Sequence, residues 1–271
     1  MRIALIILAF LCVLAPVANA QDASPLKKLM TISDSRGWEA VGRVNIAAQT
    51  YCTGALIAPN LVLTAAHCLF DRSTGRRFSV NEIEFLAGWR NGSANAHSTM
   101  RRVIPHPKFE FNGGDSNVRV AYDVALLELN HPILKTSVTP FQTDVRPRKG
   151  AEVGVVSYAR NRSENPSLQE VCHVLARRSA TLVLSCDVDF GASGAPVFSV
   201  AEDGTARIVS VVSAKAEVSG RKVALGTILE KPLAELMALL ASGESVAEPA
   251  PVRVLNLGGS SSGSGAKFVR P

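Results

Sequence analysis

The segment that decides the fold is Leu61–Cys68, which reads LVLTAAHC. It is a short apolar run that ends on a histidine directly beside a cysteine. Two later segments are also unusual. Tyr122–Leu127 (YDVALL) places an acid at the start of an apolar run, and Phe190–Pro196 (FGASGAP) places a serine among small residues. Each segment alone has an ordinary structural interpretation, as a surface histidine, a turn cap or a plain loop.

Together the three segments contain the parts of a nucleophilic site. A serine hydroxyl is a poor nucleophile until a base takes its proton, and the base needs an acid that fixes its tautomer. His67, Asp123 and Ser193 supply these groups, in that order along the chain. The small residues around Ser193 allow backbone N–H groups to point at one spot, as stabilisation of an oxyanion requires.

On these residues the sequence resembles the chymotrypsin-like (trypsin-fold) serine endopeptidases, and their secreted bacterial members more than the animal digestive enzymes. The resemblance covers roughly residues 38–242. Residues 52–57 (CTGALI) and 62–68 are similar to the histidine block of the family, residues 123–127 to its aspartate block and residues 191–196 to its serine block. The resemblance implies an all-β fold of two six-stranded antiparallel β-barrels with a C-terminal α-helix.

The resemblance also implies a role for each site residue. His67 is expected to act as the general base, Asp123 to orient it, and Ser193 to attack the scissile carbonyl from the other barrel. The backbone N–H groups of Gly191 and Ser193 are expected to form the oxyanion hole. The implied activity is hydrolysis of peptide bonds in polypeptide substrates through an acyl-enzyme, with no cofactor and no metal.

Two residues of the serine block depart from the family pattern. Digestive members carry an acid directly before the serine, where it pairs with a newly freed N-terminus, but this chain has Ala192. We therefore expect that the protein does not use that activation switch. Ala195 replaces a glycine; bacterial members often tolerate this change, so we do not expect it to inactivate the site.

The sequence leaves the substrate specificity open. Asp187 lies six residues before Ser193, where trypsin-like members carry the acid that receives Arg or Lys. It either lines such a pocket or braces the serine loop. Ser213-Ala214-Lys215 resembles the strand that lines the pocket, and a lysine there disfavours a basic side chain or favours an acidic one. Asp187 in the pocket would favour a basic substrate side chain and Lys215 would disfavour one, so the two charges predict opposite specificities.

The cysteines indicate an oxidising compartment. Of five, Cys12 lies in the N-terminal apolar run, and the other four allow three pairings. Their spacing favours two local disulfides, Cys52–Cys68 and Cys172–Cys186, and the first matches the histidine-loop disulfide of the family. A zinc site is the competing interpretation, but no CxxC or HxxxH spacing supports it.

Composition excludes several classes of protein. The 271 residues are 47% apolar, 19% charged and 6% aromatic, in short runs broken by 20 Gly and 14 Pro. This is too apolar for a disordered chain and excludes a polytopic membrane protein, a coiled coil or a collagen-like rod. The net charge of +6 is spread along the chain. We therefore expect no binding to nucleic acid.

The N-terminus reads as a targeting signal, with a positive start, an apolar run and Ala18-Asn19-Ala20 as a cleavage site. It predicts a secreted or periplasmic protein without a membrane anchor after cleavage. Pro232 and Gly243 bound one amphipathic helix. We expect a signal peptide (1–20), an N-terminal arm or pro-segment (21–37), a first barrel (38–130), a connector (131–150), a second barrel with the helix (151–243) and a flexible tail (244–271).

Eight short runs rich in Val and Ile, bounded by turn residues, predict antiparallel strands. They are residues 41–47, 61–64, 83–87, 124–129, 153–158, 181–186, 208–212 and 223–229.

Two other functions fit the sequence less well than a serine endopeptidase. A catalytically silent binding protein on the same fold usually lacks a triad member, and none is missing here. An esterase of the nucleophile-elbow type requires Gly-x-Ser-x-Gly, which residues 191–194 do not match.

Overall fold

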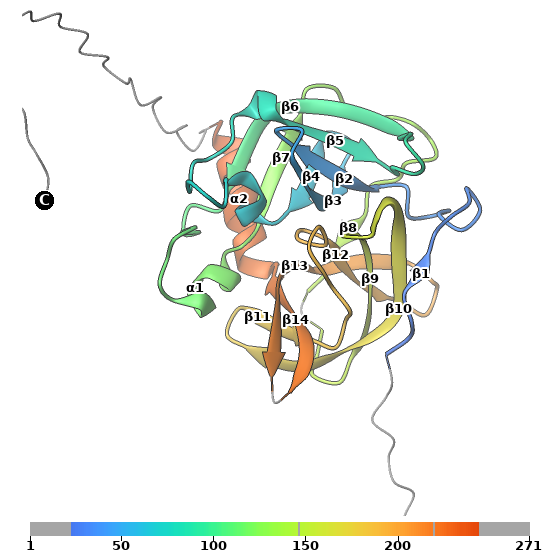
Figure 1. The fold of residues 1–271 in the computed structure, drawn as a ribbon, viewed down its shortest axis with the longest axis vertical. Helices are drawn as coiled ribbons and strands as arrows, with labels where there is room; N and C mark the ends of the chain where they lie inside the picture. The colour runs from blue at the N-terminus through green and yellow to red at the C-terminus, as the bar shows by residue number, and fades with distance from the viewer. Residues whose placement is uncertain (1–22, 146, 219, 244–271) are drawn as a thin grey trace, which may run out of the picture.

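The computed structural model describes residues 23–145, 147–218 and 220–243. Figure 1 shows two groups of strands, one above the other. The upper group is a closed antiparallel barrel in the order β2-β3-β4-β7-β6-β5. Its strands are β2 (Val41–Ile46), β3 (Thr50–Ala58), β4 (Leu61–Thr64), β5 (Ile83–Ala87), β6 (Ala96–Pro105) and β7 (Ala125–Leu129). Three short helical turns join them: η1 (Ala66–Leu69), η2 (Val80–Glu82) and α1 (Ser116–Ala121).

The lower group also closes on itself. The order β9-β10-β11-β14-β13-β12 returns to β9, because both β10 and β12 pair with β9. Its strands are β9 (Glu152–Ala159), β10 (Arg162–Arg178), β11 (Thr181–Leu184), β12 (Pro196–Val200), β13 (Ala206–Val218) and β14 (Arg221–Ile228). Two short strands add to it: β1 (Lys27–Lys28) pairs with β10, and β8 (Gln142–Thr143) pairs with β13. The expected fold of two six-stranded barrels is confirmed.

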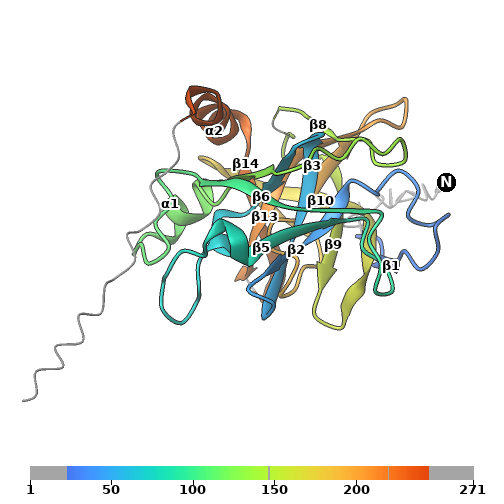
Figure 2. The ribbon, with the colours of Figure 1, turned by 90° about the horizontal axis from the view of Figure 1, so that it is seen from above.

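The predicted helix is present as α2 (Glu230–Ser242). It ends at Gly243, whose positive φ of 75° is the left-handed conformation that a glycine adopts at low cost after a helix. Although it follows the second barrel in sequence, α2 packs toward the first: Leu236 is fully buried in the main core, and Arg102 of β6 donates to the carbonyl of Leu240 at 3.2 Å. Figure 2 shows α2 at the periphery of the molecule.

An aromatic cluster joins the two barrels. Trp38 precedes the first barrel, Phe141 lies between the barrels and Phe198 belongs to β12. The ring of Phe198 lies 4.9 Å from that of Trp38 and 4.7 Å from that of Phe141. Phe198 is fully buried and belongs to the same core cluster as the first-barrel residues. Burial of large rings at this junction fixes the relative position of the two barrels.

Each of the eight predicted apolar runs lies on a strand. The strands that were not predicted are β1, β3, β6, β8, β10 and β12, and α1 was not predicted either. The expected signal peptide and tail lie outside the described residues. The expected connector contains β8, and the described part of the expected arm contains β1. Among the described helices, none has the length and hydropathy needed to cross a bilayer.

Candidate active site

His67 is held by the turn that follows β4. The chain leaves β4 at Thr64 and enters the single turn η1, which contains both His67 and Cys68. The disulfide between Cys68 and Cys52 ties this turn to β3. A short turn pinned covalently to a strand gives the imidazole little freedom to move.

Asp123 lies between α1 and β7 and is 2% exposed. Its Oδ2 lies 2.7 Å from Nδ1 of His67, and its Oδ1 accepts a hydrogen bond from the backbone N–H of His67 at 2.8 Å. A third donor is the hydroxyl of Ser213, 2.5 Å from Oδ2. These three donors compensate a carboxylate that is otherwise cut off from water.

Two hydroxyls of the second barrel fix the aspartate segment. Ser213 comes from β13, and Thr227 of β14 donates to the carbonyl of Val120 at 2.6 Å, just before Asp123. Ser213, predicted to lie in a substrate pocket, lines the cavity of His67 and also donates its hydroxyl to Asp123. Thr227 was not predicted, since a buried threonine on a β-strand is an ordinary core residue and carries no motif.

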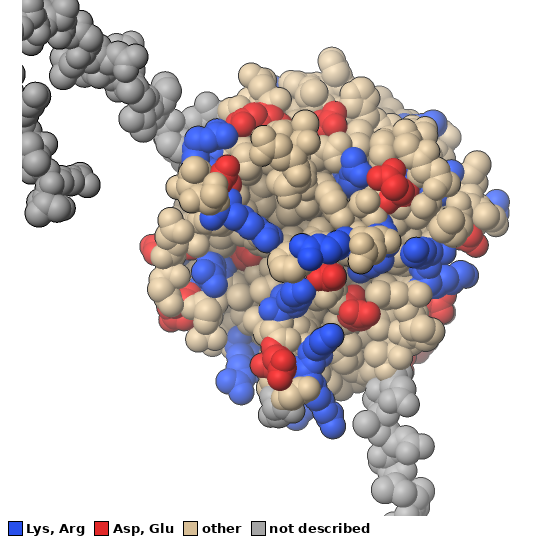
Figure 3. Space-filling view, viewed as in Figure 1, with Lys and Arg blue, Asp and Glu red and all other residues tan. Residues whose placement is uncertain are grey.

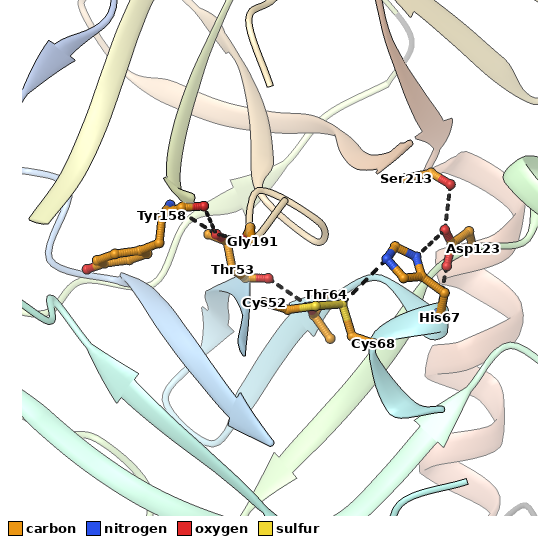
Figure 4. The surroundings of a disulfide bond; sticks show 9 residues. All are labelled: Cys52, Thr53, Thr64, His67, Cys68, Asp123, Tyr158, Gly191 and Ser213. Atoms are coloured by element: carbon orange, nitrogen blue, oxygen red, sulfur yellow. Dashed lines mark hydrogen bonds and ion pairs between the residues drawn. A yellow bond between two sulfur atoms is a disulfide. The ribbon is translucent and has the colours of Figure 1, made fainter. Parts of the chain in front are cut away.

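The arrangement sets the tautomer of His67. An ionised carboxylate only accepts hydrogen bonds, so Nδ1 of His67 carries the proton and Nε2 keeps its lone pair in the neutral ring. Figure 4 shows the imidazole between Asp123 and the disulfide, with Nε2 turned away from the acid. Nε2 lies 4.0 Å from Sγ of Cys68. His67 therefore has the form of a base whose acceptor nitrogen is free.

The serine loop is attached to both barrels. The carbonyl of Ser193 accepts from the backbone N–H of Thr53 in β3 at 2.8 Å, and the N–H of Gly194 donates to Val212 in β13 at 2.8 Å. The hydroxyl of Thr53 donates to the carbonyl of Gly191 at 2.9 Å and accepts from the N–H of Tyr158 at 3.1 Å. Figure 4 shows Thr53 between these two residues. The loop is thus positioned without an acid at residue 192.

The N–H groups in this loop alternate between bonded and free. The N–H of Ala192 donates to Asp189 at 2.9 Å and that of Gly194 to Val212, whereas those of Gly191 and Ser193 have no acceptor within the described part of the chain. Gly191 has a φ of 97°, which turns this part of the loop into a concave shape. Two unpaired N–H groups beside a serine hydroxyl are what an oxyanion hole requires.

Gly194 allows the loop to approach the first barrel. It has a φ of 78°, and a Cβ built on it would lie 2.1 Å from Oγ1 of Thr64 and 2.3 Å from the carbonyl oxygen of Thr53. No side chain fits there without moving strand backbone. The glycine therefore permits the contact that brings Ser193 toward the turn of His67.

His67, Asp123 and Ser193 line one open cavity of about 570 Å³. The other lining residues include Val212, Ser213 and Ala214 of β13. Among the described residues, the hydroxyl of Ser193 makes no hydrogen bond, to His67 or to any other group. Catalytic hydrogen bonds are often long in the absence of substrate and shorten when it binds.

Asp187 and Lys215, the two charged residues predicted to influence specificity, lie in a neighbouring cavity of about 540 Å³. Lys215 lines both cavities and forms an ion pair with Asp189 at 2.7 Å. This pairing lowers the pKa of Asp189 through the hydrogen bond from Lys215. Asp187 is exposed, and its carboxylate accepts no hydrogen bond within the described residues. The sequence did not single out Asp189, although it stands two residues from Asp187.

Both expected disulfides, Cys52–Cys68 and Cys172–Cys186, are confirmed. Potential metal-binding atoms of Cys52, His67 and Cys68 lie within 4.8 Å of one another. The two sulfurs are bonded to each other, however, and a disulfide offers no thiolate to a metal. The cluster is accounted for by the disulfide beside the imidazole.

Two closed antiparallel barrels, with a histidine–carboxylate pair on one and a serine loop on the other, define the class of two-barrel serine proteases. The family model described as Trypsin matches residues 33–224. Because this is more than half of the chain, the protein belongs to the trypsin family of serine proteases.

The chain is similar to several curated proteins. It is 27% identical to serine protease 23 of Rattus norvegicus over 175 residues, which are 57% of this chain and 44% of the relative. It is 25% identical to a glutamyl endopeptidase of Bacillus licheniformis over 194 residues, 66% of this chain and 59% of the relative. The matched region thus spans less than half of serine protease 23.

A solved structure described as a Glu endopeptidase in complex with MPD is similar in fold. It has a TM-score of 0.65 and 18% sequence identity, with 83% of this chain and 99% of that chain covered. This likeness agrees with the two-barrel architecture.

Proposed function

We propose that this protein is an exported serine endopeptidase that hydrolyses polypeptides through a triad of His67, Asp123 and Ser193. The observation that carries the proposal is the buried, fully hydrogen-bonded Asp123 on Nδ1 of His67, with Ser193 on the same cavity. Pairing to a buried acid leaves the second imidazole nitrogen as a proton acceptor. Family membership gives the general activity, and this geometry supports its retention.

In the proposed reaction, Nε2 of His67 takes the proton of the Ser193 hydroxyl as Oγ attacks the scissile carbonyl. The negative charge that develops on the carbonyl oxygen is accepted by the N–H groups of Gly191 and Ser193; one such donor is typically worth about 3–4 kcal/mol. His67 then gives its proton to the leaving amine. Water, activated by the same nitrogen, hydrolyses the acyl-enzyme and restores Ser193.

The cavity of about 540 Å³ that contains Asp187 and Lys215 is proposed to receive the substrate side chain on the acyl side of the scissile bond. The charge of Lys215 is paired with Asp189 in the structure. The carboxylate of Asp187 has no hydrogen-bond donor within the described residues, which supports a role in the pocket over a brace for the serine loop. The cavity also contains Glu217 and Lys222. Charge of both signs therefore lines it.

Export is proposed from the predicted signal peptide at residues 1–20 together with the two disulfides. Disulfides of this kind form and persist in oxidising compartments. Each closes a short loop, with sequence separations of 16 and 14. The loop-entropy estimate for such sizes is about 3 kcal/mol of stability.

Replacement of the nucleophile tests the proposal. Ser193→Ala should lower kcat for casein or a peptide by about 10⁶-fold, since without Oγ no acyl-enzyme forms. A fluorophosphonate probe should label the wild-type protein and fail to label this variant. Ser199→Ala, on strand β12 directly after the loop, is the matched control and should be labelled normally. A correctly folded wild-type protein that is neither labelled nor active would instead support the silent binding protein.

A further inference from the structure

An exposed aromatic ring stands directly before the serine loop with three cations around it. Phe190 is 41% exposed and lines the cavity that contains Ser193. Its ring centroid lies 4.2 Å from Nζ of Lys215, 4.6 Å from the guanidinium carbon of Arg160 and 5.7 Å from that of Arg72. We call these four residues the cationic collar.

The positive charge of the collar is only partly compensated. Lys215 is ion-paired with Asp189, but the guanidinium groups of Arg72 and Arg160 make no hydrogen bond or ion pair within the described residues. Both arginines are exposed. Figure 3 shows Lys and Arg side chains, with Asp and Glu among them, across the middle of the face drawn in Figure 1, where the two barrels meet. All three cations lie within 6 Å of the same ring centroid, so they add to the positive potential at one place on the surface.

The collar residues come from three distant parts of the chain. Arg72 follows η1, Arg160 follows β9, and Lys215 lies on β13. Local sequence therefore does not explain their meeting at one ring. Like charges gathered at the mouth of a cavity raise the free energy of the empty protein and favour an anionic ligand.

The positions of the two arginines indicate which part of a substrate meets them. Arg72 lines the cavity of Ser193 and also a smaller one of about 300 Å³, which contains Tyr51 and the Cys52–Cys68 disulfide. His67 lines both cavities. Arg160 lies close enough to Tyr51 to lower the pKa of its hydroxyl electrostatically, although burial raises that pKa overall.

His67 delivers a proton to the leaving amine, so the leaving segment lies on its side of the scissile bond. In the proposed reaction the acyl segment would lie along residues 212–215 of β13, which line the larger cavity. The smaller cavity, beyond His67, is then the path of the leaving segment. Arg72 lines this path, and so does Tyr51, to which Arg160 lies close.

We propose that the cationic collar selects substrates with an acidic side chain at the first or second residue after the scissile bond. The carboxylate would bind between Arg72 and Arg160, whose planar guanidinium groups suit bidentate pairing with a carboxylate. Phe190 would support the apolar part of the same side chain. This inference rests on the proposed endopeptidase function and adds a substrate class to it.

Paired peptides test the inference. Two peptides should be compared that differ only in Glu or Gln at the first residue after the scissile bond, with a second pair for the next residue. For at least one pair, kcat/KM should be about two- to fivefold higher with Glu, the size expected of exposed charge pairs. In Arg72→Gln/Arg160→Gln the ratio should fall to about one. Arg178→Gln, an exposed arginine at the end of β10, is the matched control and should keep the wild-type ratio.

Charge reversal and salt provide independent readouts. Arg72→Glu/Arg160→Glu should prefer Lys over Gln in the same peptides, and added salt should reduce the wild-type preference for Glu. Cleavage of the Gln peptides with a Glu-to-Gln ratio of one at both positions would overturn the collar and leave the endopeptidase standing. A ratio that survives in the double Gln variant would also overturn it. Failure to cleave any of the peptides would count against the endopeptidase itself, and the collar would fall with it.

Discussion

Two of the three histidine–carboxylate pairs in the described part of the chain differ in which partner is buried. In the first, Asp123 is buried and His67 is partly open, with Nδ1 at 2.7 Å from Oδ2. In the second, the side chain of His106 is fully buried and that of Glu235, on α2, is 41% exposed, with Nε2 at 3.1 Å from Oε2. The same two groups at similar distances therefore occupy different environments.

The difference shows that a paired histidine is not by itself a base. In His106, Nδ1 accepts from the backbone N–H of Lys108 at 3.2 Å, and Nε2 is buried next to the carboxylate of Glu235. The ring of His106 also stacks on Tyr122, with 4.8 Å between ring centroids. Nε2 of His67 lies 4.0 Å from Sγ of Cys68, but a disulfide sulfur has no proton to donate. The lone pair of Nε2 is therefore available for the proposed proton transfer.

The largest difference between the two pairs is expected when each acid becomes an amide. Asp123→Asn should lower kcat by about 10⁴-fold, because an amide no longer holds Nδ1 of His67 as the proton-bearing nitrogen. Glu235→Gln should change kcat by less than about twofold, since its carboxylate is solvated and lies outside the cavity. Steady-state kinetics on one peptide measures both. Equal losses in the two variants would remove the distinction between the pairs.

A smaller effect is expected from the hydroxyl of Ser213, which donates to the acid of the His67–Asp123 pair. Ser213→Ala should lower kcat by about tenfold with little change in KM, because Asp123 loses one of its three donors. Ser210→Ala removes a buried hydroxyl from the same strand that donates to the carbonyl of Thr227 at 2.8 Å. This control should affect stability more than kcat. A rise in KM without a fall in kcat would show that Ser213 acts on substrate binding and not through Asp123.

The smallest effect is expected from the second pair and concerns stability. Burial lowers the pKa of His106 from its usual value of 6.5, against the opposing charge of Glu235 and with a smaller contribution from Lys108. Below pH 6.5 the unfolded chain therefore binds a proton that the folded protein resists, and stability falls as the pH falls toward the folded pKa. The melting temperature should drop by a few degrees over this range. The drop should be smaller in His106→Gln, and an identical slope would contradict the assignment.

Much of the first barrel and its histidine could be predicted because the signal is local. An apolar run ending on His67 beside Cys68, and a second cysteine at the right distance, fix a strand, a turn and a disulfide together. The missed elements carry weaker patterns. The strand β10 contains Arg, Glu, Asn and Pro, and α1 has only six residues, too few to show helical periodicity.

The supporting residues of the site could not be predicted for a different reason. Thr53 and Thr227 act through hydrogen bonds between their hydroxyls and backbone groups more than 100 residues away. Arg72 and Arg160 meet only because the two barrels face each other. Such partners follow from the three-dimensional arrangement, and no spacing within the chain records them. Thr53 does carry a weak signal, because it is a polar residue next to Cys52 in the histidine block, and a polar side chain in an apolar strand needs a hydrogen-bond partner.

The N-terminal strand has a practical consequence for anyone who shortens this protein. Lys27–Lys28 continues the second barrel by pairing with Leu168 and Ser167, and the next residue, Leu29, is 1% exposed. A recombinant version that starts at Gly37 would lose this cover. It would leave an unpaired strand edge and an apolar hollow, the features that promote self-association. Truncations intended for crystallisation should therefore keep Ser24, just before β1, whose backbone N–H donates to the carbonyl of Val171.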